Sequence, residues 1–351
     1  MDCRSSPEVL SVKRPGLPFR IPVQWVRDMA GVLTSVSRTL IHDRPMRRLP
    51  ILLSLALSVS LVCAAEPDAA FKVEHDVSYL PADRAEKLDL YLPERNPAQA
   101  EQRRPAILVI HGGGWRAGDK AAKRETQIAE TLAKAGFVVA SINYMMHPHP
   151  FDPKNPFKDK SVVYPRNVWD CKAAIRWLRV HADAYRIRPE AIGVIGGSAG
   201  GHLSMLMAWS GDEKELDPPE YPGVSTKVGA VVNLYGIPDV RRPIGNGPHP
   251  SGEGFTGKTP EQDPALYALL SPVDHLRADS APILTLNGTK DDVVPYSYSV
   301  DLQKALGAKG VPHEFITVKD APHTFLIWDP QAGYDYRSKI VSFFSGLLGK
   351  P

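Results

Sequence analysis

The chain has 351 residues, 43% hydrophobic and 23% charged, which is the composition of an ordinary globular protein. Its formal net charge of +3 is unevenly spread, because residues 1–50 carry nine Lys and Arg against four acidic residues, whereas residues 66–351 are close to neutral. A nearly neutral body argues against a nucleic-acid partner, and the 27 Gly and 33 Pro follow no period that would indicate a collagen-like or solenoid protein.

The first recognisable segment in chain order has the pattern of an export signal. Met46-Arg47-Arg48 precedes the uncharged run ILLSLALSVSLVCAA, which is too short to span a membrane and ends in small residues. This pattern predicts a signal peptide over residues 46–65, cleaved after Ala64 or Ala65. We therefore expect a secreted or periplasmic protein with no membrane span once the signal is removed.

Alternatives stay open at this end of the chain. Residues 1–45 are either an over-called extension upstream of a start at Met46 or a disordered arm. Lipid anchoring through Cys63 is the less favoured alternative, because Val62 is bulky where lipoprotein signals place a small residue. Only Cys171 follows the signal, so no internal disulfide is expected.

From residue 66 onward, apolar strands alternate with helical segments. Strands are predicted over 73–80, 88–92, 106–110, 137–144, 191–195, 230–234, 283–286 and 313–318, and helices over 123–135, 168–180, 199–209, 298–308 and 334–348. The first two strands alternate like antiparallel edge strands, whereas 106–110 is apolar throughout, as in a strand buried on both faces. The pattern predicts one α/β domain over residues 66–351, with a mostly parallel sheet and helices on both faces.

Residues 235–276 interrupt this alternation. The segment is polar and rich in Gly and Pro, with a single short helical piece near 264–270. It lies between two predicted strands, so we expect a cap-like insertion over the carboxyl edge of the sheet, where open α/β sheets bind ligands.

The run Gly196-Gly197-Ser198-Ala199-Gly200 joins the predicted strand 191–195 to the helix that follows it. A strand, a tight turn and a helix are what a nucleophile elbow needs to raise a serine hydroxyl above the sheet, and the flanking glycines prevent collisions in the turn. Ser198 is therefore the predicted nucleophile. The alternative is a glycine-rich turn with a packing role only.

The run His111-Gly112-Gly113-Gly114-Trp115 ends the buried strand 106–110. Consecutive glycines let backbone N–H groups approach a reacting carbonyl without side chains between them. The N–H groups of Gly113 and Gly114, with that of Ala199, are the predicted oxyanion hole, and His111 and Trp115 are predicted to support the loop. A phosphate-binding loop is the alternative, but no Lys-Ser/Thr pair follows the glycines.

These two motifs resemble those of α/β-hydrolase esterases related to hormone-sensitive lipase, and more closely the bifunctional feruloyl/acetylxylan-esterase-like (BD-FAE) branch. The likeness continues in the runs AAIRWL at 173–178, FTG at 255–257, NGTKDDVVP at 287–295 and APHTF at 321–325, so it covers essentially all of 70–350.

The resemblance implies the α/β-hydrolase fold and a triad in the chain order Ser, Asp, His. The acid then falls on Asp291, with Asp292 as its rival, and the base falls on His323 after strand 313–318. Asn287 stands where the family usually has His.

Together these residues predict a serine carboxylic-ester hydrolase that forms an acyl-enzyme and needs no cofactor or metal. The resemblance implies acetyl or feruloyl esters, on small molecules or on polysaccharide, as substrates. Two alternatives are a prolyl-oligopeptidase-like serine peptidase and a catalytically silent binding module on the same fold.

Overall fold

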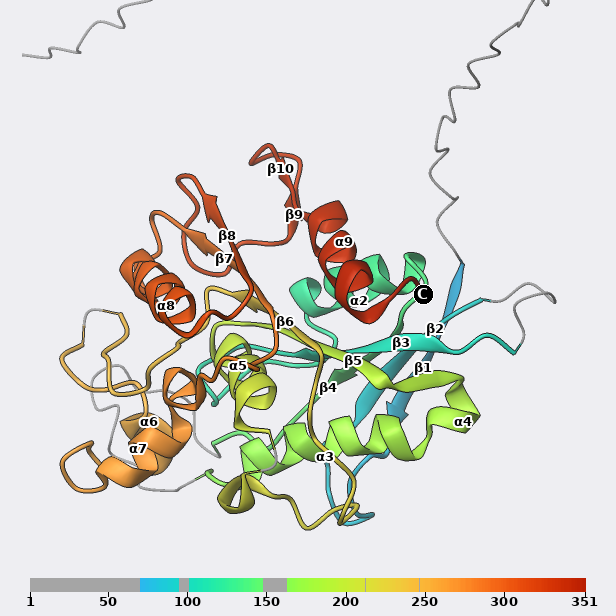
Figure 1. Cartoon of the computed structure of the whole chain (residues 1–351), viewed down its shortest axis with the longest axis horizontal. Coiled ribbons are helices and arrows are strands. Elements are labelled where there is room, and N and C mark those ends of the chain that lie inside the picture. Colours follow the sequence, from blue (N-terminus) through green and yellow to red (C-terminus); the bar gives the residue numbers. More distant parts are fainter. Residues whose placement is uncertain (1–69, 95–100, 148–162, 212, 246) are drawn as a thin grey trace, which may run out of the picture. The chain divides into compact units, whose positions relative to one another are not determined.

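An eight-stranded sheet is the centre of the fold (Figure 1). The structure, a computed structural model, describes residues 70–94, 101–147, 163–211, 213–245 and 247–351. The predictions for residues 1–45, for the signal peptide at 46–65 and for Cys63 lie outside these ranges. In the part that is described, no helix is long and apolar enough to cross a membrane.

The strand order confirms a mostly parallel sheet. It runs β1 (Phe71–Val77), β2 (Leu88–Pro93), β4 (Val138–Ile142), β3 (Arg104–Ile110), β5 (Ile187–Gly197), β6 (Ala230–Leu234), β7 (Ile283–Gly288) and β8 (His313–Val318). The β1–β2 and β2–β4 pairs are antiparallel, and all other neighbouring pairs are parallel. Both of the first two strands were predicted to be edge strands. The prediction is correct for β1 but wrong for β2, which lies between β1 and β4 with all six of its residues buried.

Helices cover both faces of the sheet, as predicted. Helices α2 (Lys123–Lys134) and α9 (Arg337–Leu348) share one apolar core with Ile107 and Val109 of β3. Helices α3 (Arg166–Val180), α5 (Ala199–Ser210) and α8 (Tyr296–Lys309) share the other core with Leu108 and Ile110. Successive side chains of a strand point to opposite faces, so β3 must be apolar throughout to fill both cores. Two short elements, α4 (Ala182–Tyr185) and the 3₁₀ helix η2 (Lys214–Leu216), complete this half of the molecule.

The C-terminal helix begins later than predicted. Helix α9 starts at Arg337, whereas the sequence pattern starts the helix at residue 334. Of the three residues before Arg337, the first two form strand β10 (Tyr334–Asp335), which pairs with β9 (Trp328–Asp329) in a separate two-stranded sheet. Pairing with a segment six residues upstream therefore overrides the helical pattern.

The insertion at 235–276 contains more helix than predicted. Besides α7 (Pro264–Leu270), it forms α6 (Glu253–Thr256) and the 3₁₀ helix η3 (Pro272–His275). Helix α6 is too short to be stable alone, and Phe255 anchors it because its ring is fully buried against the ring of Trp115, with 4.5 Å between centroids. In Figure 1, α6 and α7 are at the lower left, on the same side of the view as α8.

Several hydrogen bonds fasten the insertion to the carboxyl edge of the sheet, three of them to the residue after the glycine loop, the loop after β7 and α5. Arg116 donates to the carbonyl of Gly254 (2.5 Å), and the amide of Gly245 donates to the carbonyl of Val293 (2.7 Å). In the third, His202 of α5 contacts the carbonyl of Leu270 through Nε2, at 2.8 Å. The carboxyl edge is thus the place where insertion, glycine loop and α5 meet.

Candidate active site

Three side chains from separate strand ends meet at this edge. Ser198 follows β5, Asp291 follows β7 and His323 follows β8. His323 Nε2 lies 2.9 Å from Ser198 Oγ, and its Nδ1 lies 2.9 Å from Asp291 Oδ2. A carboxylate only accepts hydrogen bonds, so Nδ1 carries the proton, and in the neutral imidazole Nε2 accepts from the Ser198 hydroxyl. The arrangement can withdraw a proton from Ser198.

The backbone at Ser198 has φ 57° and ψ −123°, a strained conformation that lifts the side chain out of the turn between β5 and α5. The flanking glycines are required by close contacts. A Cβ at Gly200 would lie 2.1 Å from the carbonyl oxygen of Ile110, and one at Gly196 would lie 2.4 Å from the carbonyl oxygen of Gly200. The motif therefore needs glycine on both sides of the serine.

The carboxylate of Asp291 is held from both of its oxygens. Oδ1 accepts from the amides of Val293 (3.0 Å) and Val294 (2.8 Å), and Oδ2 accepts from Asn287 Nδ2 (3.1 Å) as well as from His323. Asp292, the rival for this position, is exposed to solvent. Of the two carboxylates, Asp291 is the one that contacts His323.

The glycine loop lies directly against the serine turn. A Cβ at Gly112 would lie 2.6 Å from the carbonyl oxygen of Gly197 and 3.3 Å from Ser198 Cβ. Gly113 and Gly114 both have positive φ, at 113° and 61°, which glycine adopts without strain. Among the described residues, the N–H groups of these two glycines and of Ala199 have no hydrogen-bond acceptor. Three donors are therefore available for a negatively charged oxygen.

The two residues that flank these glycines are buried in the base of the loop. His111 stacks on Tyr144 with 4.3 Å between ring centroids, and its Nδ1 lies 2.8 Å from the carbonyl oxygen of Gly112. Burial lowers the pKa of His111. Trp115 donates from Nε1 to His202 Nδ1 at 3.3 Å. Both side chains are in positions to hold the loop.

His202 and His147 are both engaged with protein groups. Burial lowers the pKa of His202 to about 4, so this fully buried imidazole is neutral, and its ring lies between Trp115 and the carbonyl of Leu270. His147 Nδ1 lies 2.8 Å from an Arg116 nitrogen. Across the described ranges, no group of three or more His, Cys, Asp and Glu side chains is arranged to hold a metal ion.

Tyr235 and Arg124 belong to the site but were not singled out from the sequence. The hydroxyl of Tyr235 donates to the carbonyl of Phe325 (3.1 Å) and accepts from Arg124 Nη1 (3.0 Å). Its ring meets that of His323 edge to face, with centroids 4.9 Å apart. Burial raises the pKa of Tyr235 to about 12, although Arg124 opposes the rise, so the phenol keeps its proton. The position of Tyr235 directly after strand β6 was a usable signal, whereas nothing local marks Arg124.

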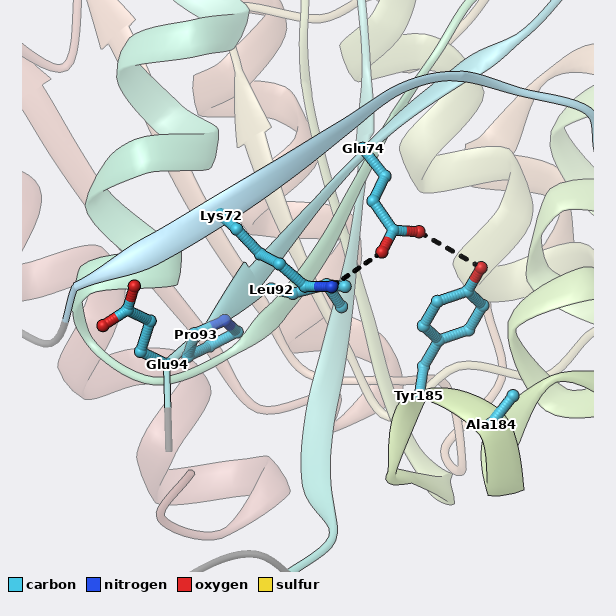
Figure 2. Close-up of a pocket in the computed structure, with 7 residues that line it drawn as sticks. All are labelled: Lys72, Glu74, Leu92, Pro93, Glu94, Ala184 and Tyr185. Atoms are coloured by element: carbon cyan, nitrogen blue, oxygen red, sulfur yellow. Dashed lines mark hydrogen bonds and ion pairs between the residues drawn. The ribbon is translucent and has the colours of Figure 1, made fainter. Parts of the chain in front are cut away.

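A hollow of about 370 Å³ lies elsewhere on the molecule, between β1, β2 and α4 (Figure 2). Because β2 runs antiparallel to β4, its last residue, Pro93, lies at the amino edge of the parallel strands, opposite Ser198. The lining includes Lys72, Glu74 and Tyr185, with Glu74 bound to Lys72 at 2.9 Å, and none of the described lining residues is Ser, Cys or His. Its chemistry is that of a surface ion pair, and the candidate active site is the Ser198 region.

Residues 88–306 match the BD-FAE family model. The chain belongs to the BD-FAE family. Its sheet order, helices on both faces and strand–turn–helix at Ser198 are those of the α/β-hydrolase fold. The family match and the fold agree with the resemblance drawn from the motifs.

Several curated relatives of this BD-FAE protein are named as esterases. It is 30% identical over 225 residues to the "Probable carboxylic ester hydrolase LipM" of Mycobacterium tuberculosis, a match that covers 63% of this chain and 48% of LipM. The chain thus spans about half the length of that curated relative.

Two solved structures are similar over most of the chain. A truncated carbohydrate esterase from gut microbiota superimposes with a TM-score of 0.66 at 28% identity, covering 82% of this chain and 99% of that one. Esterase 2 of Thermogutta terrifontis, phosphorylated by paraoxon, gives a TM-score of 0.57 at 25% identity and covers 80% of this chain and 92% of that one.

Proposed function

We propose that this BD-FAE protein is a serine carboxylic-ester hydrolase in which Ser198, His323 and Asp291 form the catalytic triad. The observation that carries the proposal is the unbroken chain of hydrogen bonds from Ser198 Oγ through the His323 ring to Asp291 Oδ2. The esterase names of LipM and of the two structural neighbours support the same reaction class.

In the proposed first half-reaction, Ser198 Oγ attacks the ester carbonyl while its proton moves to His323 Nε2. Asp291 stabilises the imidazolium that forms and keeps its Nδ1–H in place. The tetrahedral intermediate collapses when the C–O bond to the alcohol breaks and His323 returns the proton to that leaving oxygen. An acyl group remains on Ser198. In the second half-reaction, a water molecule deprotonated by His323 attacks the acyl carbonyl. The bond from that carbon to Ser198 Oγ then breaks, His323 returns the proton to Oγ, and the carboxylic acid leaves.

The negative oxygen of each tetrahedral intermediate is proposed to bind the N–H groups of Gly113, Gly114 and Ala199. Their lack of other acceptors in the described part of the chain supports this role. Helix α5 begins at Ala199, so the positive end of its dipole faces the same oxygen. Removal of one such donor typically costs about 3–4 kcal/mol of transition-state stabilisation.

Covalent labelling tests this proposal. A fluorophosphonate probe followed by peptide mapping should place one adduct on Ser198 in the folded protein, and Ser198→Ala should abolish both labelling and hydrolysis of p-nitrophenyl acetate. Ser204→Ala alters another buried serine of α5 and should leave both unchanged. Folded wild-type protein that takes no label would overturn the proposal and favour the silent binding module. Hydrolysis of p-nitroanilide peptides in place of esters would favour the peptidase.

Acetyl or feruloyl esters, carried by a small molecule or a polysaccharide, are the proposed substrates. Membership of the BD-FAE family and the carbohydrate esterase among the structural neighbours support this class. Rates on acetylated xylan and methyl ferulate, compared with simple p-nitrophenyl esters, distinguish a carbohydrate esterase from a general one.

Export through the signal at residues 46–65 is a separate proposal. It agrees with a polysaccharide substrate, which an enzyme would meet outside the cytoplasm. N-terminal sequencing of exported material should begin near Ala65 or Glu66. Mature exported protein that still begins at Met1 would contradict it.

A further inference from the structure

Asn287 is a side chain beside the proposed triad that the reaction as described does not use. It lies at the carboxyl end of β7, four residues before Asp291, and is fully buried. Its Nδ2 lies 3.1 Å from Asp291 Oδ2, the same oxygen that receives the Nδ1–H of His323. The carboxylate accepts hydrogen bonds only, so the amide must direct its N–H₂ group, and not its oxygen, toward Asp291.

The orientation of that amide is itself fixed. Asn287 Oδ1 accepts a hydrogen bond of 2.7 Å from Ser299 Oγ, and Ser299 lies on α8 with 1% of its surface exposed. A flipped amide would direct its oxygen at the Asp291 carboxylate, so that two acceptors would face each other with no proton between them. Buried polar groups that lose their partners are costly, so the observed orientation is strongly preferred.

The backbone of Asn287 is also tied to the strand that leads to His323. In the parallel β7–β8 pair, Asn287 is opposite Thr317, six residues before His323. Its side chain and its backbone therefore connect the acid, the base-bearing strand and α8. A group in this position controls how the Asp291 carboxylate is turned.

We propose that Asn287 is a positioning residue: with Ser299, it holds Asp291 Oδ2 toward His323 and shares that oxygen's negative charge. The role rests on the proposed function of Asp291 and His323. Two consequences follow. Without Asn287, the carboxylate can rotate away from the line to Ser198, which slows the chemical step. While the carboxylate does face His323, Oδ2 serves a single donor and accepts the Nδ1–H more strongly.

The test compares Asn287→Ala and Ser299→Ala with Thr285→Val, a matched control. Thr285 is buried on the same strand, two residues before Asn287, and valine keeps the shape of its side chain. We expect kcat on p-nitrophenyl acetate to fall about tenfold to a hundredfold in Asn287→Ala with little change in KM, the size associated with losing a hydrogen bond to a charged group. In Ser299→Ala, which keeps the Nδ2 donor of Asn287 but loses the hydrogen bond that fixes the amide, kcat should fall several-fold. Thr285→Val should match the wild type.

A second measurement does not depend on esterase activity. The His323 Nδ1–H gives a downfield proton resonance in NMR spectra when it is hydrogen-bonded to Asp291, and this resonance should move further downfield in Asn287→Ala. Melting temperatures and circular dichroism establish whether each variant is folded. If Asn287→Ala does not fold, the resonance and kcat of Ser299→Ala are compared with those of the wild type.

The outcomes separate this inference from the proposed function. A wild type whose activity and labelling depend on Ser198, together with an Asn287→Ala variant of unchanged kcat and unchanged resonance, would overturn the role of Asn287 alone. A wild type inactive on esters, with a resonance that still moves in Asn287→Ala, would overturn the proposed function and support Asn287 as the group that holds Asp291 toward His323. A Thr285→Val variant as impaired as Asn287→Ala would show a general effect of β7 and overturn the inference.

Discussion

At the scale of single residues, the Asp291 carboxylate accepts hydrogen bonds from four donors, which fix its orientation. In Asp291→Asn, the amide oxygen keeps the bonds from Val293 and Val294, so its N–H₂ group must face two other donors, Asn287 Nδ2 and His323 Nδ1. The His323 ring is then driven to the tautomer that cannot accept the Ser198 proton. We expect kcat to fall by about 10⁴, as for other triads with this change. Hydrolysis of p-nitrophenyl acetate and a melting curve measure the two effects.

Asp292→Asn is the control for that substitution, because the neighbouring carboxylate is exposed to solvent. It should retain near wild-type turnover and the same melting temperature. A large loss in Asp292→Asn beside a small one in Asp291→Asn would mean that the acid had been assigned one residue too early.

His202 gives a prediction about stability and pH. Burial lowers its pKa in the folded protein to about 4, from an ordinary value near 6.5. Between these values the unfolded chain binds a proton that the native state does not, so the free energy of unfolding falls as the pH drops from 6.5 toward 4. The loss from this group is about 3 kcal/mol by the time the pH reaches 4. Urea unfolding at pH 7.5 and pH 4.5 measures most of it.

The matching variant is His202→Gln, which cannot titrate. It should lose less free energy of unfolding than the wild type over the same pH interval, whatever its stability at pH 7.5. Equal losses in the two proteins would show that His202 is not the group responsible.

At the scale of elements, the β5–α5 turn is constrained by close packing. Gly200→Ala would place a Cβ 2.1 Å from the carbonyl oxygen of Ile110, so strand β3 and helix α5 would have to move apart. We expect a loss of about 1–3 kcal/mol in the free energy of unfolding and a larger fractional loss of activity, since Ser198 moves with the turn. Chemical unfolding and esterase rates measure both.

Gly346→Ala makes the same change inside helix α9, where no heavy atom lies within 4 Å of the added Cβ. Alanine is a better helix former than glycine, so the free energy of unfolding of this variant should rise by up to about 1 kcal/mol, with full activity retained. Equal effects at the two positions would mean that the close contact at Gly200 relaxes without cost.

The elements could be predicted from sequence where their own residues decide their structure. Strands β6 and β8 and helix α7 have the predicted bounds because each combines a clear apolar pattern with sharp turn residues at its ends. Prediction failed where a partner outside the element decides the structure. Helix α6 depends on burial of Phe255 under Trp115, and strand β10 depends on pairing with β9.

The same distinction applies to the site. Ser198, Asp291 and His323 each follow a strand in a recognisable motif, so the sequence could predict that they lie at one edge of the sheet. The contacts of Arg124 with Tyr235, and of Ser299 with Asn287, join residues 111 and 12 positions apart. No local sequence pattern predicts these contacts, because they depend on how α2 and α8 pack against the sheet.

At the scale of the whole molecule, the insertion at 235–276 lies at the carboxyl edge of the sheet, the same edge as the candidate active site. Its large apolar side chains are used in packing: Phe255, Tyr267 and Leu270 are fully buried. The large hydrophobic side chains exposed in the described part of the chain are Val180, Trp328 and Leu347, all outside the insertion. Ile244, Leu266, Leu269 and Val273 of the insertion are half-buried against the same core as Phe255.

This composition predicts a preference for short acyl groups. A deep apolar slot would add about 0.8 kcal/mol for each buried methylene, so kcat/KM would climb steeply with chain length. In its described part the insertion has no fully exposed large apolar side chain to form such a slot, so acetyl to butyryl esters should be preferred, with activity falling beyond about eight carbons. Values of kcat/KM for p-nitrophenyl acetate, butyrate, octanoate and palmitate, measured below the micelle-forming concentration of each ester, decide the matter. A maximum at octanoate or beyond would require an apolar channel that the insertion does not provide, and would favour a lipase-like enzyme over one that acts on short or carbohydrate-linked esters.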